Sequence, residues 1–266
     1  MLHDHRLRSI ALAGMIASLP FLSSFTVAAQ TVKNPPRTPV LVELFTSEGC
    51  STCPPADALL AKLDHDQPIG GAEIIVLGEH VDYWDQLGWH DRFSSHQYTD
   101  RQSQYSARLN VDGVYTPQMI VDGTDQFVGN DASHAIRSIT RAAQTSKLSL
   151  AISHPVVSGH RIAATVSKPA SPSGQLQGGD LYAVLVEPLA TTEVRHGENG
   201  GRRLQHAGVV RSLQRIGTLK DLASGPHPFS LDAPADVSPG SMRIVVFAQR
   251  SGQGAILAAG STPVTP

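Results

Sequence analysis

Two kinds of hydrophobic patterning divide the chain near residue 146. Before that point, apolar runs such as 40–45, which includes one acid, and 74–77 are separated by segments in which apolar residues recur every three or four positions. Such runs are typical of strands buried on both faces, and the second spacing is typical of amphipathic helices. After residue 146 the apolar residues mostly alternate with polar ones, in short runs between Gly- and Pro-rich stretches. This half predicts an all-β sandwich-like structure of about seven strands.

The first half predicts an alternation of strands and helices. The expected elements are a strand over 40–45, a helix near 55–63, a strand over 73–78, a helix over 93–109, a strand and hairpin around the Asp122-Gly123 turn, and a helix over 131–144. This order predicts an α/β domain over 39–146, followed by the β-sandwich-like domain over 147–266.

The N-terminus has the features of a secretory signal peptide. An apolar stretch from Ile10 to Val27 follows basic residues, and small residues provide a cleavage site before Gln30. We therefore expect residues 1–29 to be removed on export to the periplasm or the cell exterior, with 30–38 as a linker. Because Pro20 interrupts the apolar stretch, no stable membrane span is expected after cleavage.

The charge balance limits the classes of partner. The whole chain has 21 basic and 23 acidic residues. This balance argues against nucleic acid and anionic membranes as partners. The sequence also lacks the G-x-S-x-G, phosphate-cradling Gly-Lys-Ser/Thr and His-Glu-x-x-His patterns, so nothing in it indicates a hydrolase or a nucleotide-binding protein.

Candidate chemistry is concentrated at Cys50 and Cys53, which are the only two cysteines in the chain. A C-x-x-C pair between a strand and a helix is typical of a redox-active dithiol, because the turn exposes the first sulfur and keeps the second within disulfide reach. A structural disulfide is an alternative, although so short a loop contributes only about 2 kcal/mol. A zinc site would need further ligands that the sequence does not offer nearby, while soft-metal binding with a distant histidine stays open. No resident metal or cofactor is predicted.

The segment after the second strand is a candidate binding surface. His80, Asp82 and Trp84 follow the carboxyl end of a strand, where open α/β sheets bind their ligands. A loop that caps the core is the alternative for this segment. A single histidine such as His80 is also more often a hydrogen-bonded structural residue than a ligand or a base.

A second charged segment lies in the later half. Residues 193–206 are rich in glycine and include Arg202, Arg203 and His206. A contact with an anionic substrate or partner near the dithiol is one interpretation of this composition. We favour the other, a hairpin tip that is surrounded by solvent.

Four segments give the chain a resemblance to a known family. They are VELFTSEGCSTCPPADALLAKL, EHVDYWDQLGW, VYTPQMIVDG and GRRLQHAGVVRSLQRIG. Together they resemble a secreted thioredoxin-like family, domain of unknown function 1223, over about residues 39–259. The resemblance implies a thioredoxin-like α/β fold for 39–146 and an exported protein, but it names no substrate.

The thioredoxin resemblance implies roles for individual residues. Cys50 matches the attacking cysteine, Cys53 the resolving cysteine, and Pro117 the cis-proline beside the disulfide. The cis bond would turn the backbone of Thr116 outward to pair with a substrate strand. Glu43 resembles, one residue out of register, the buried acid under the disulfide, and would accept the proton of Cys53. An acid at a strand edge facing water is the alternative for Glu43.

Two prolines distinguish this motif from that of thioredoxins. Pro54 and Pro55 delay the start of the helix, so the helix N-terminus lowers the pKa of Cys50 less. Glu48 acts in the same direction, and no basic residue lies in or beside the motif. We therefore expect a Cys50 thiol with an ordinary or mildly lowered pKa.

These observations predict a thiol–disulfide oxidoreductase. Its substrates would be exported proteins or small thiols, and a separate redox partner protein would restore its dithiol. The alternative is a non-enzymatic binding module, or a soft-metal-binding protein, in which the disulfide is structural.

Overall fold

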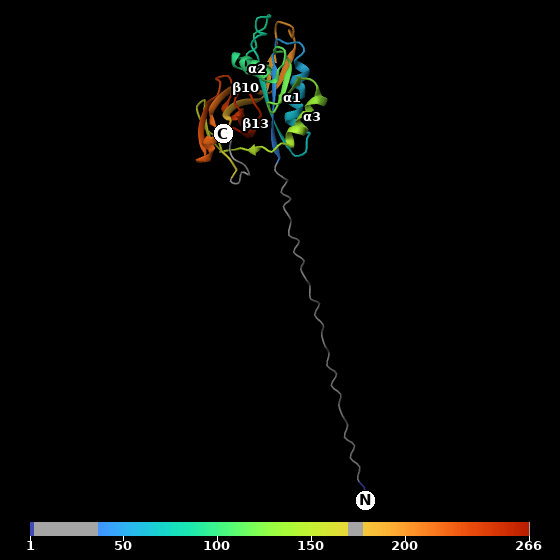
Figure 1. Ribbon diagram of the computed structural model, residues 1–266, viewed down its shortest axis with the longest axis vertical. Coiled ribbons are helices and arrows are strands. Elements are labelled where there is room, and N and C mark those ends of the chain that lie inside the picture. The colour runs from blue at the N-terminus through green and yellow to red at the C-terminus, as the bar shows by residue number, and fades with distance from the viewer. Residues whose placement is uncertain (3–36, 170–177, 266) are drawn as a thin grey trace. The chain divides into compact units, whose positions relative to one another are not determined.

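The structure is a computed structural model that describes residues 1–2, 37–169 and 178–265 (Figure 1). The expected signal peptide, apart from its first two residues, and the linker up to residue 36 lie outside the described residues. Strand β1 already begins at Thr38, within the range expected for the linker. Among the helices of the described residues, none combines the length and hydrophobicity that a membrane span requires.

The helices and strands of the first half have the types and order expected from the sequence. In chain order the described elements are β1 (Thr38–Thr46), α1 (Pro54–Asp66), β2 (Ala72–His80), α2 (His96–Leu109), β3 (Gln118–Val121), β4 (Asp125–Val128), α3 (Ala132–Ala143), β5 (Leu148–Ser149), β6 (Ala151–Ile152), β7 (Val156–Ser158), β8 (Arg161–Ser167), β9 (Asp180–Glu193), β10 (Arg203–Thr218), η1 (Leu219–Ala223), β11 (His227–Asp232), η2 (Pro239–Ser241), β12 (Arg243–Gln249) and β13 (Ile256–Pro263). Helix α2 begins later than expected because the side chain of Ser95 accepts a hydrogen bond from the N–H of Gln97 and so caps the helix.

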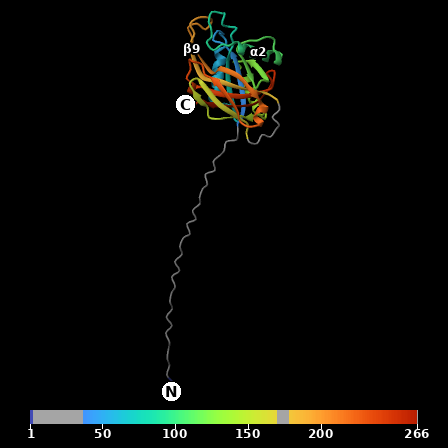
Figure 2. The same ribbon diagram turned by 90° about the vertical axis from the view of Figure 1, so that its left-hand side faces the viewer.

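One mixed sheet joins strands from the two halves of the chain (Figures 1 and 2). Over the described residues its nine strands have the order β4-β3-β1-β2-β10-β9-β12-β13-β5. The predicted fold class, a thioredoxin-like α/β domain followed by an all-β sandwich-like domain, is therefore wrong. Instead of starting a separate sandwich, β10 pairs in parallel with β2, with Val209 opposite Gly78.

Two glycines allow this pairing. Gly208 has a φ of +65°, and a Cβ on it would lie 2.7 Å from Cγ2 of Val76 and 2.9 Å from the carbonyl oxygen of Val76. A Cβ on Gly78 would lie 3.0 Å from the carbonyl oxygen of Ala207. Only residues without a side chain permit so close an approach of backbone to backbone.

Alternation along β1 places its side chains on two faces of the sheet. Val40, Val42 and Leu44 pack with residues of α1 and α3, which lie together on one side (Figure 1). Leu41 belongs to a different cluster, shared with residues of α2, β9, β10, β12 and β13 on the other face. The two faces of β1 therefore have different neighbours, and this decides where each functional side chain points.

A smaller sheet covers the later strands. It has the order β11-β8-β6, with β7 paired to β8, and its apolar residues pack on those of β9 and β12. The alternation after residue 146 was thus correctly interpreted as strands, but these strands pack against an extension of the first sheet. Lys147, at the expected domain boundary, buries its ammonium group against the carboxylate of Asp122.

Candidate functional site

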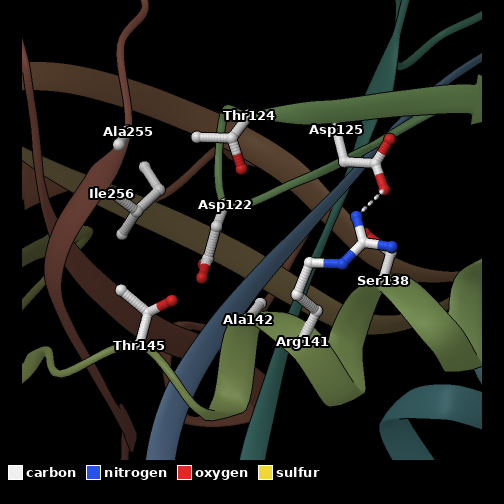
Figure 3. A pocket seen from close by; sticks show the side chains of 9 residues that line it. All are labelled: Asp122, Thr124, Asp125, Ser138, Arg141, Ala142, Thr145, Ala255 and Ile256. Atoms are coloured by element: carbon white, nitrogen blue, oxygen red, sulfur yellow. Dashed lines mark ion pairs between the residues drawn. The ribbon is translucent and has the colours of Figure 1, made fainter.

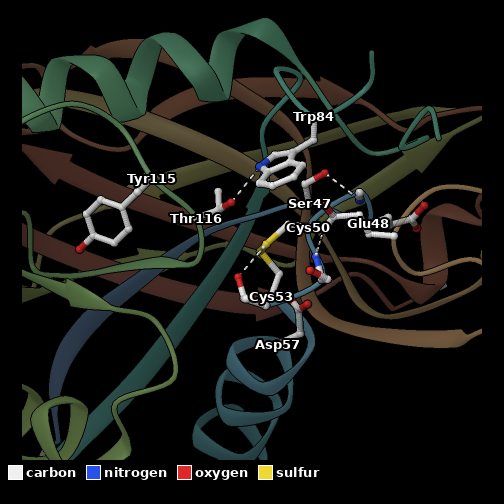
Figure 4. The surroundings of a disulfide bond; sticks show 12 residues. Ser47, Glu48, Cys50, Cys53, Asp57, Trp84, Tyr115 and Thr116 are labelled. Atoms are coloured by element: carbon white, nitrogen blue, oxygen red, sulfur yellow. Dashed lines mark hydrogen bonds between the residues drawn. A yellow bond between two sulfur atoms is a disulfide. The ribbon is translucent and has the colours of Figure 1, made fainter. Parts of the chain in front are cut away.

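The two cysteines form a disulfide between the end of β1 and the start of α1 (Figure 4). The backbone N–H of Cys53 donates to the carbonyl of Cys50 at 3.2 Å, and Cys53 is the N-cap of α1. Pro54 begins the helix, at a position where an N–H has no intrahelical partner. Neither cysteine has exposed surface. The expectation that the turn exposes the sulfur of Cys50 is therefore wrong for the disulfide form.

The connection between β9 and β10 holds the cysteine turn from the other half of the chain. The side-chain amide of Asn199 donates to the carbonyl oxygens of Glu48 and Cys50, each at 2.9 Å. The carboxylate of Glu198 accepts from the N–H of Ser51 at 3.1 Å, and hydrogen bonding to Ser51 lowers the pKa of Glu198. Asn199 is fully buried, so this part of 193–206 is not the solvated hairpin tip that we expected.

A cis peptide bond lies beside the disulfide. The bond between Thr116 and Pro117 is cis, as the resemblance implied. The indole Nε1 of Trp84 donates to the hydroxyl of Thr116 at 2.9 Å, and both residues lie next to the disulfide (Figure 4). Two further hydrogen bonds anchor the neighbouring carbonyl groups: Gln102 donates to Tyr115 at 2.7 Å, and the N–H of Gly129 donates to Pro117 at 2.9 Å.

The other two residues of the expected binding surface are held by side chains away from the disulfide. His80 is buried, and its Nδ1 lies 2.6 Å from Oδ2 of Asp91. Asp82 accepts a hydrogen bond from the hydroxyl of Thr99 at 2.6 Å and so holds the first turn of α2. Of the three residues, only Trp84 is part of the surroundings of the disulfide.

Glu43 lies on the face of β1 that α1 does not cover. Its Oε1 accepts from Nε and Nη2 of Arg101 at 2.7 and 2.5 Å, and its Oε2 accepts from the hydroxyl of Tyr105 at 2.6 Å. Because successive side chains of a strand point to opposite faces, the shift of one residue that separates Glu43 from the thioredoxin acid turns it away from α1 and Cys53. The geometry therefore does not support Glu43 as the acceptor of the Cys53 proton.

Arg101 has a second buried acid beside it. Oε1 of Glu79 is 3.4 Å from Nε of Arg101, but neither carboxylate oxygen has a hydrogen-bond partner among the described residues. Burial raises the pKa of Glu79 well above its ordinary value, although the charge of Arg101 opposes this. Glu43 is thus the hydrogen-bonded partner of Arg101, and Glu79 favours its protonated form.

A different group of buried ionisable residues lies beside the disulfide. Nε2 of His206 is 3.6 Å from Oε1 of Glu48, and its Nδ1 is 3.7 Å from Oδ1 of Asp57. Trp89 donates to the other oxygen of Glu48 at 2.7 Å. Burial alone lowers the pKa of His206, but the two carboxylates outweigh it and raise the pKa to about 10. His206 is therefore an imidazolium between two buried acids.

A second histidine–acid pair adjoins this group. The rings of His80 and His206 meet edge to face, with centroids 4.7 Å apart. Asp91 accepts from His80 and from the backbone N–H of Glu48. Burial raises the pKa of Asp91, but the charge and hydrogen bond of His80 bring it below its ordinary value. Across the described residues, no group of three or more His, Cys, Asp or Glu side chains has an arrangement that could hold a metal ion.

The sequence did not reveal this group because its members come from distant segments. The pattern did place Asp57 in the first turn of α1, where an acid favours the helix dipole. The sequence singled out His206 only as a member of the charged segment 193–206. It lies on β10 and reaches Glu48 and Asp57 only because β10 pairs with β2. No basic residue lies beside the motif in the sequence, but in the folded protein His206 lies beside the acids that flank it.

Two hollows on the described part of the protein border different elements. One, of 530 Å³, borders the start of α1 and is lined by Pro54, Asp57, Ala58, Ala61, Leu189, Arg202, Arg203, Leu204 and Gln205. The other, of 330 Å³, lies between the β3–β4 turn, α3 and residues 255–256 (Figure 3). In it Arg141 reaches toward Asp125, with Nη1 and Oδ2 3.7 Å apart. The first hollow reaches Pro54, the residue after Cys53, but no cysteine lines either hollow.

Comparisons with known proteins give a family and a fold. Residues 41–249 match the family described as Protein of unknown function (DUF1223), and no curated protein matches the chain. A crystal structure of an Agrobacterium tumefaciens protein is similar at 25% identity and a TM-score of 0.63, covering 87% of this chain and 96% of that one. HBP35 of Porphyromonas gingivalis is similar in fold at 14% identity and a TM-score of 0.54, covering 87% and 77%. The first similarity spans both halves, in agreement with one continuous fold.

Proposed function

Because the chain belongs to the DUF1223 family, whose function is unknown, we propose its function from its own geometry: thiol–disulfide exchange on exported proteins or small thiols. The observation that carries the proposal is the Cys50–Cys53 disulfide at a strand–helix turn, with the cis peptide of Pro117 beside it. The periplasm or cell exterior is the proposed location, because residues 1–29 have the pattern of a signal peptide.

The exchange takes two steps. In the reduced protein, the thiolate of Cys50 attacks a disulfide of the substrate, so a Cys50–substrate bond forms and the other substrate sulfur leaves as a thiolate. Cys53 then loses its proton and attacks Cys50, which restores the Cys50–Cys53 disulfide and releases the second substrate thiol. A reducing partner protein, acting by the same chemistry in reverse, returns the dithiol.

The backbone beside the cis bond supports binding of an extended substrate. Among the described residues, neither the N–H nor the C=O of Thr116 has a hydrogen-bond partner, while its hydroxyl is held by Trp84. A free N–H and C=O just before the start of β3 can pair with the backbone of a substrate strand.

Substrate access requires a local opening. Both cysteines are fully buried. The hydrogen bonds that Asn199 donates and the one that Glu198 accepts hold the cysteine turn closed. The tip between β9 and β10 is the element whose displacement would uncover Cys50. Exchange by this protein is therefore expected to depend on movement of this tip.

The burial of both cysteines also favours a second candidate function. An enclosed disulfide is typical of a structural bridge, since thermodynamically resistant disulfides are those that are neither strained nor exposed. In that case the chain is a non-enzymatic binding module, as the sequence also allowed.

Trapping of mixed disulfides separates the two functions. A Cys53→Ala variant of the full chain, expressed in an exporting host, should accumulate disulfide-linked adducts through Cys50. The matched Cys50→Ala variant should accumulate far fewer, because Cys53 is the resolving residue. Non-reducing electrophoresis followed by mass spectrometry counts the adducts. Equal trapping, or none in either variant, contradicts thiol–disulfide exchange and leaves the binding module.

A further inference from the structure

Three charged side chains from three different segments meet beside the disulfide. Glu48 precedes Cys50 by two residues, and Asp57 follows Cys53 by one helical turn, so Asp57 lies on the same face of α1 as Cys53. Figure 4 draws Asp57 among the residues that surround the disulfide, and the backbone N–H of Asp57 donates to the carbonyl of Cys53 at 3.1 Å. Both acids are buried: the relative exposure is 0% for Glu48 and 4% for Asp57.

His206 is the cation that faces both acids. In the described part of the chain, the ion pairs that involve Glu48 or Asp57 are both with His206. With both carboxylates ionised, the group carries one net negative charge when His206 is protonated and two when it is not. Each buried charge is expensive unless an opposite charge lies close to it.

A thiolate on the reduced cysteine pair would add another negative charge at the same place. Like charges in a buried site disfavour each other's ionised form, and a nearby cation favours it. The buried carboxylates therefore oppose the formation of a thiolate, and His206 is the group that opposes them.

We propose that His206 is a positioning residue of the dithiol site: its imidazolium offsets the carboxylates of Glu48 and Asp57 and thereby lets a thiolate form on the reduced Cys50–Cys53 pair near neutral pH. The role of this thiolate as a nucleophile rests on the proposed function. The electrostatic effect itself does not need a substrate.

The remaining groups that face His206 do not replace it. His80, on β2, meets its ring edge to face, and Phe93 lies with its ring centroid 6.0 Å away. His80 is already paired with Asp91, whose carboxylate also accepts from the N–H groups of Glu48 and Phe93. The balance beside the cysteines therefore depends on His206, Glu48 and Asp57.

Titration of the thiols in the purified, reduced protein tests this inference. The ultraviolet absorbance of the thiolate, taken as the difference between reduced and oxidised protein, gives its pKa in each variant. His206→Gln should raise the thiol pKa by about one unit or more, and Asp57→Asn should lower it by a similar amount. The double variant restores the original net charge, so its thiol pKa should return close to that of the unchanged protein. His90→Gln, at an exposed histidine, is the control and should leave the pKa unchanged.

The two single variants keep the inference testable if one of them does not fold. Asp57→Asn preserves shape and removes a buried charge, so it alone should show the predicted decrease. An unchanged or raised thiol pKa in folded Asp57→Asn, or a double variant that stays as high as His206→Gln, would overturn the proposal. Because no substrate takes part, a failure of the trapping experiment with Cys53→Ala leaves this result intact, and the reverse also holds.

Discussion

Nδ1 of His206 lies 3.7 Å from Oδ1 of Asp57, although one residue belongs to β10 and the other to the first turn of α1. This pair connects the later half of the chain to the helix that carries Cys53. It also means that the charge environment of the dithiol depends on the pairing of β10 with β2. The predictions below test this arrangement and the contacts that support it.

The stability of the protein should depend on pH through His206. The pKa of His206 is raised from 6.5 to about 10 in the native state, so the native protein holds a proton that the unfolded chain releases. Its contribution to stability is complete below pH 6.5 and is lost as pH rises through about 10. At about 1.4 kcal/mol per pKa unit, the upper limit of this contribution is about 5 kcal/mol.

Denaturant unfolding between about pH 6 and pH 9 measures most of this effect, because that range lies below the titration of the tyrosines. The free energy of unfolding should decline with pH in the unchanged protein and much less in His206→Gln. His90→Gln should decline like the unchanged protein, since His90 is exposed. Parallel pH profiles in all three proteins would show that His206 is not charged in the native state.

Replacement of Gly208 should test the seam between β2 and β10. Gly208 and Gly159 have similar φ values, +65° and +60°, so an alanine at either position carries similar backbone strain of about 1 kcal/mol. They differ in space, because a Cβ on Gly159 meets no atom within 4 Å, whereas one on Gly208 overlaps Val76. Gly208→Ala should therefore reduce the free energy of unfolding by roughly 1–3 kcal/mol more than Gly159→Ala. Equal losses in the two variants would contradict the close β2–β10 contact.

The two acids beside Arg101 should respond differently to neutral replacements. Glu43→Gln removes the hydrogen-bonded partner of a buried guanidinium and should cost roughly 3 kcal/mol in the free energy of unfolding. Glu79→Gln replaces an acid that the native state keeps protonated and the unfolded chain ionises, so near neutral pH the variant should be more stable than the unchanged protein.

The pH dependence separates these acids further. The raised pKa of Glu79 means that the native state keeps a proton which the unfolded chain loses above about 4.5, so stability falls as pH rises toward the native pKa. This decline should be absent in Glu79→Gln. A Glu79→Gln variant as unstable as Glu43→Gln would mean that Glu79 is ionised and is a full partner of Arg101.

Asn199→Ala should loosen the cysteine turn. The variant loses two buried hydrogen bonds to the carbonyls of Glu48 and Cys50, which should cost about 1–3 kcal/mol and speed reduction of the disulfide by a small dithiol. Asn130→Ala, at an exposed position, is the control and should leave the reduction rate unchanged. Gly208→Ala is a second control, because it lowers the global stability without removing a hydrogen bond to the cysteine turn. If Asn199→Ala is reduced no faster than Gly208→Ala of equal stability, the tip between β9 and β10 does not control access.

Much of the local structure followed from short-range patterns. The apolar run of β1, the helical spacing of α1 and the turn at Asp122-Gly123 were all predicted, because side-chain periodicity and turn chemistry depend on neighbouring residues. The resemblance supplied the cis bond before Pro117. The position of Cys50 and Cys53 between strand and helix likewise required no tertiary information.

The sequence by itself determined the disulfide motif, the elements on either side of it and the β character of the later half. The tertiary structure alone decided that β10 completes the sheet beside β2, that Glu43 faces Arg101, and that His206 and Asn199 reach the cysteine turn. The physical reason is that periodicity tells which residues are buried but not which strand fills the open edge of a sheet. That choice rests on contacts between distant segments, and at this site the distant segments carry the cation and the amide beside the cysteines.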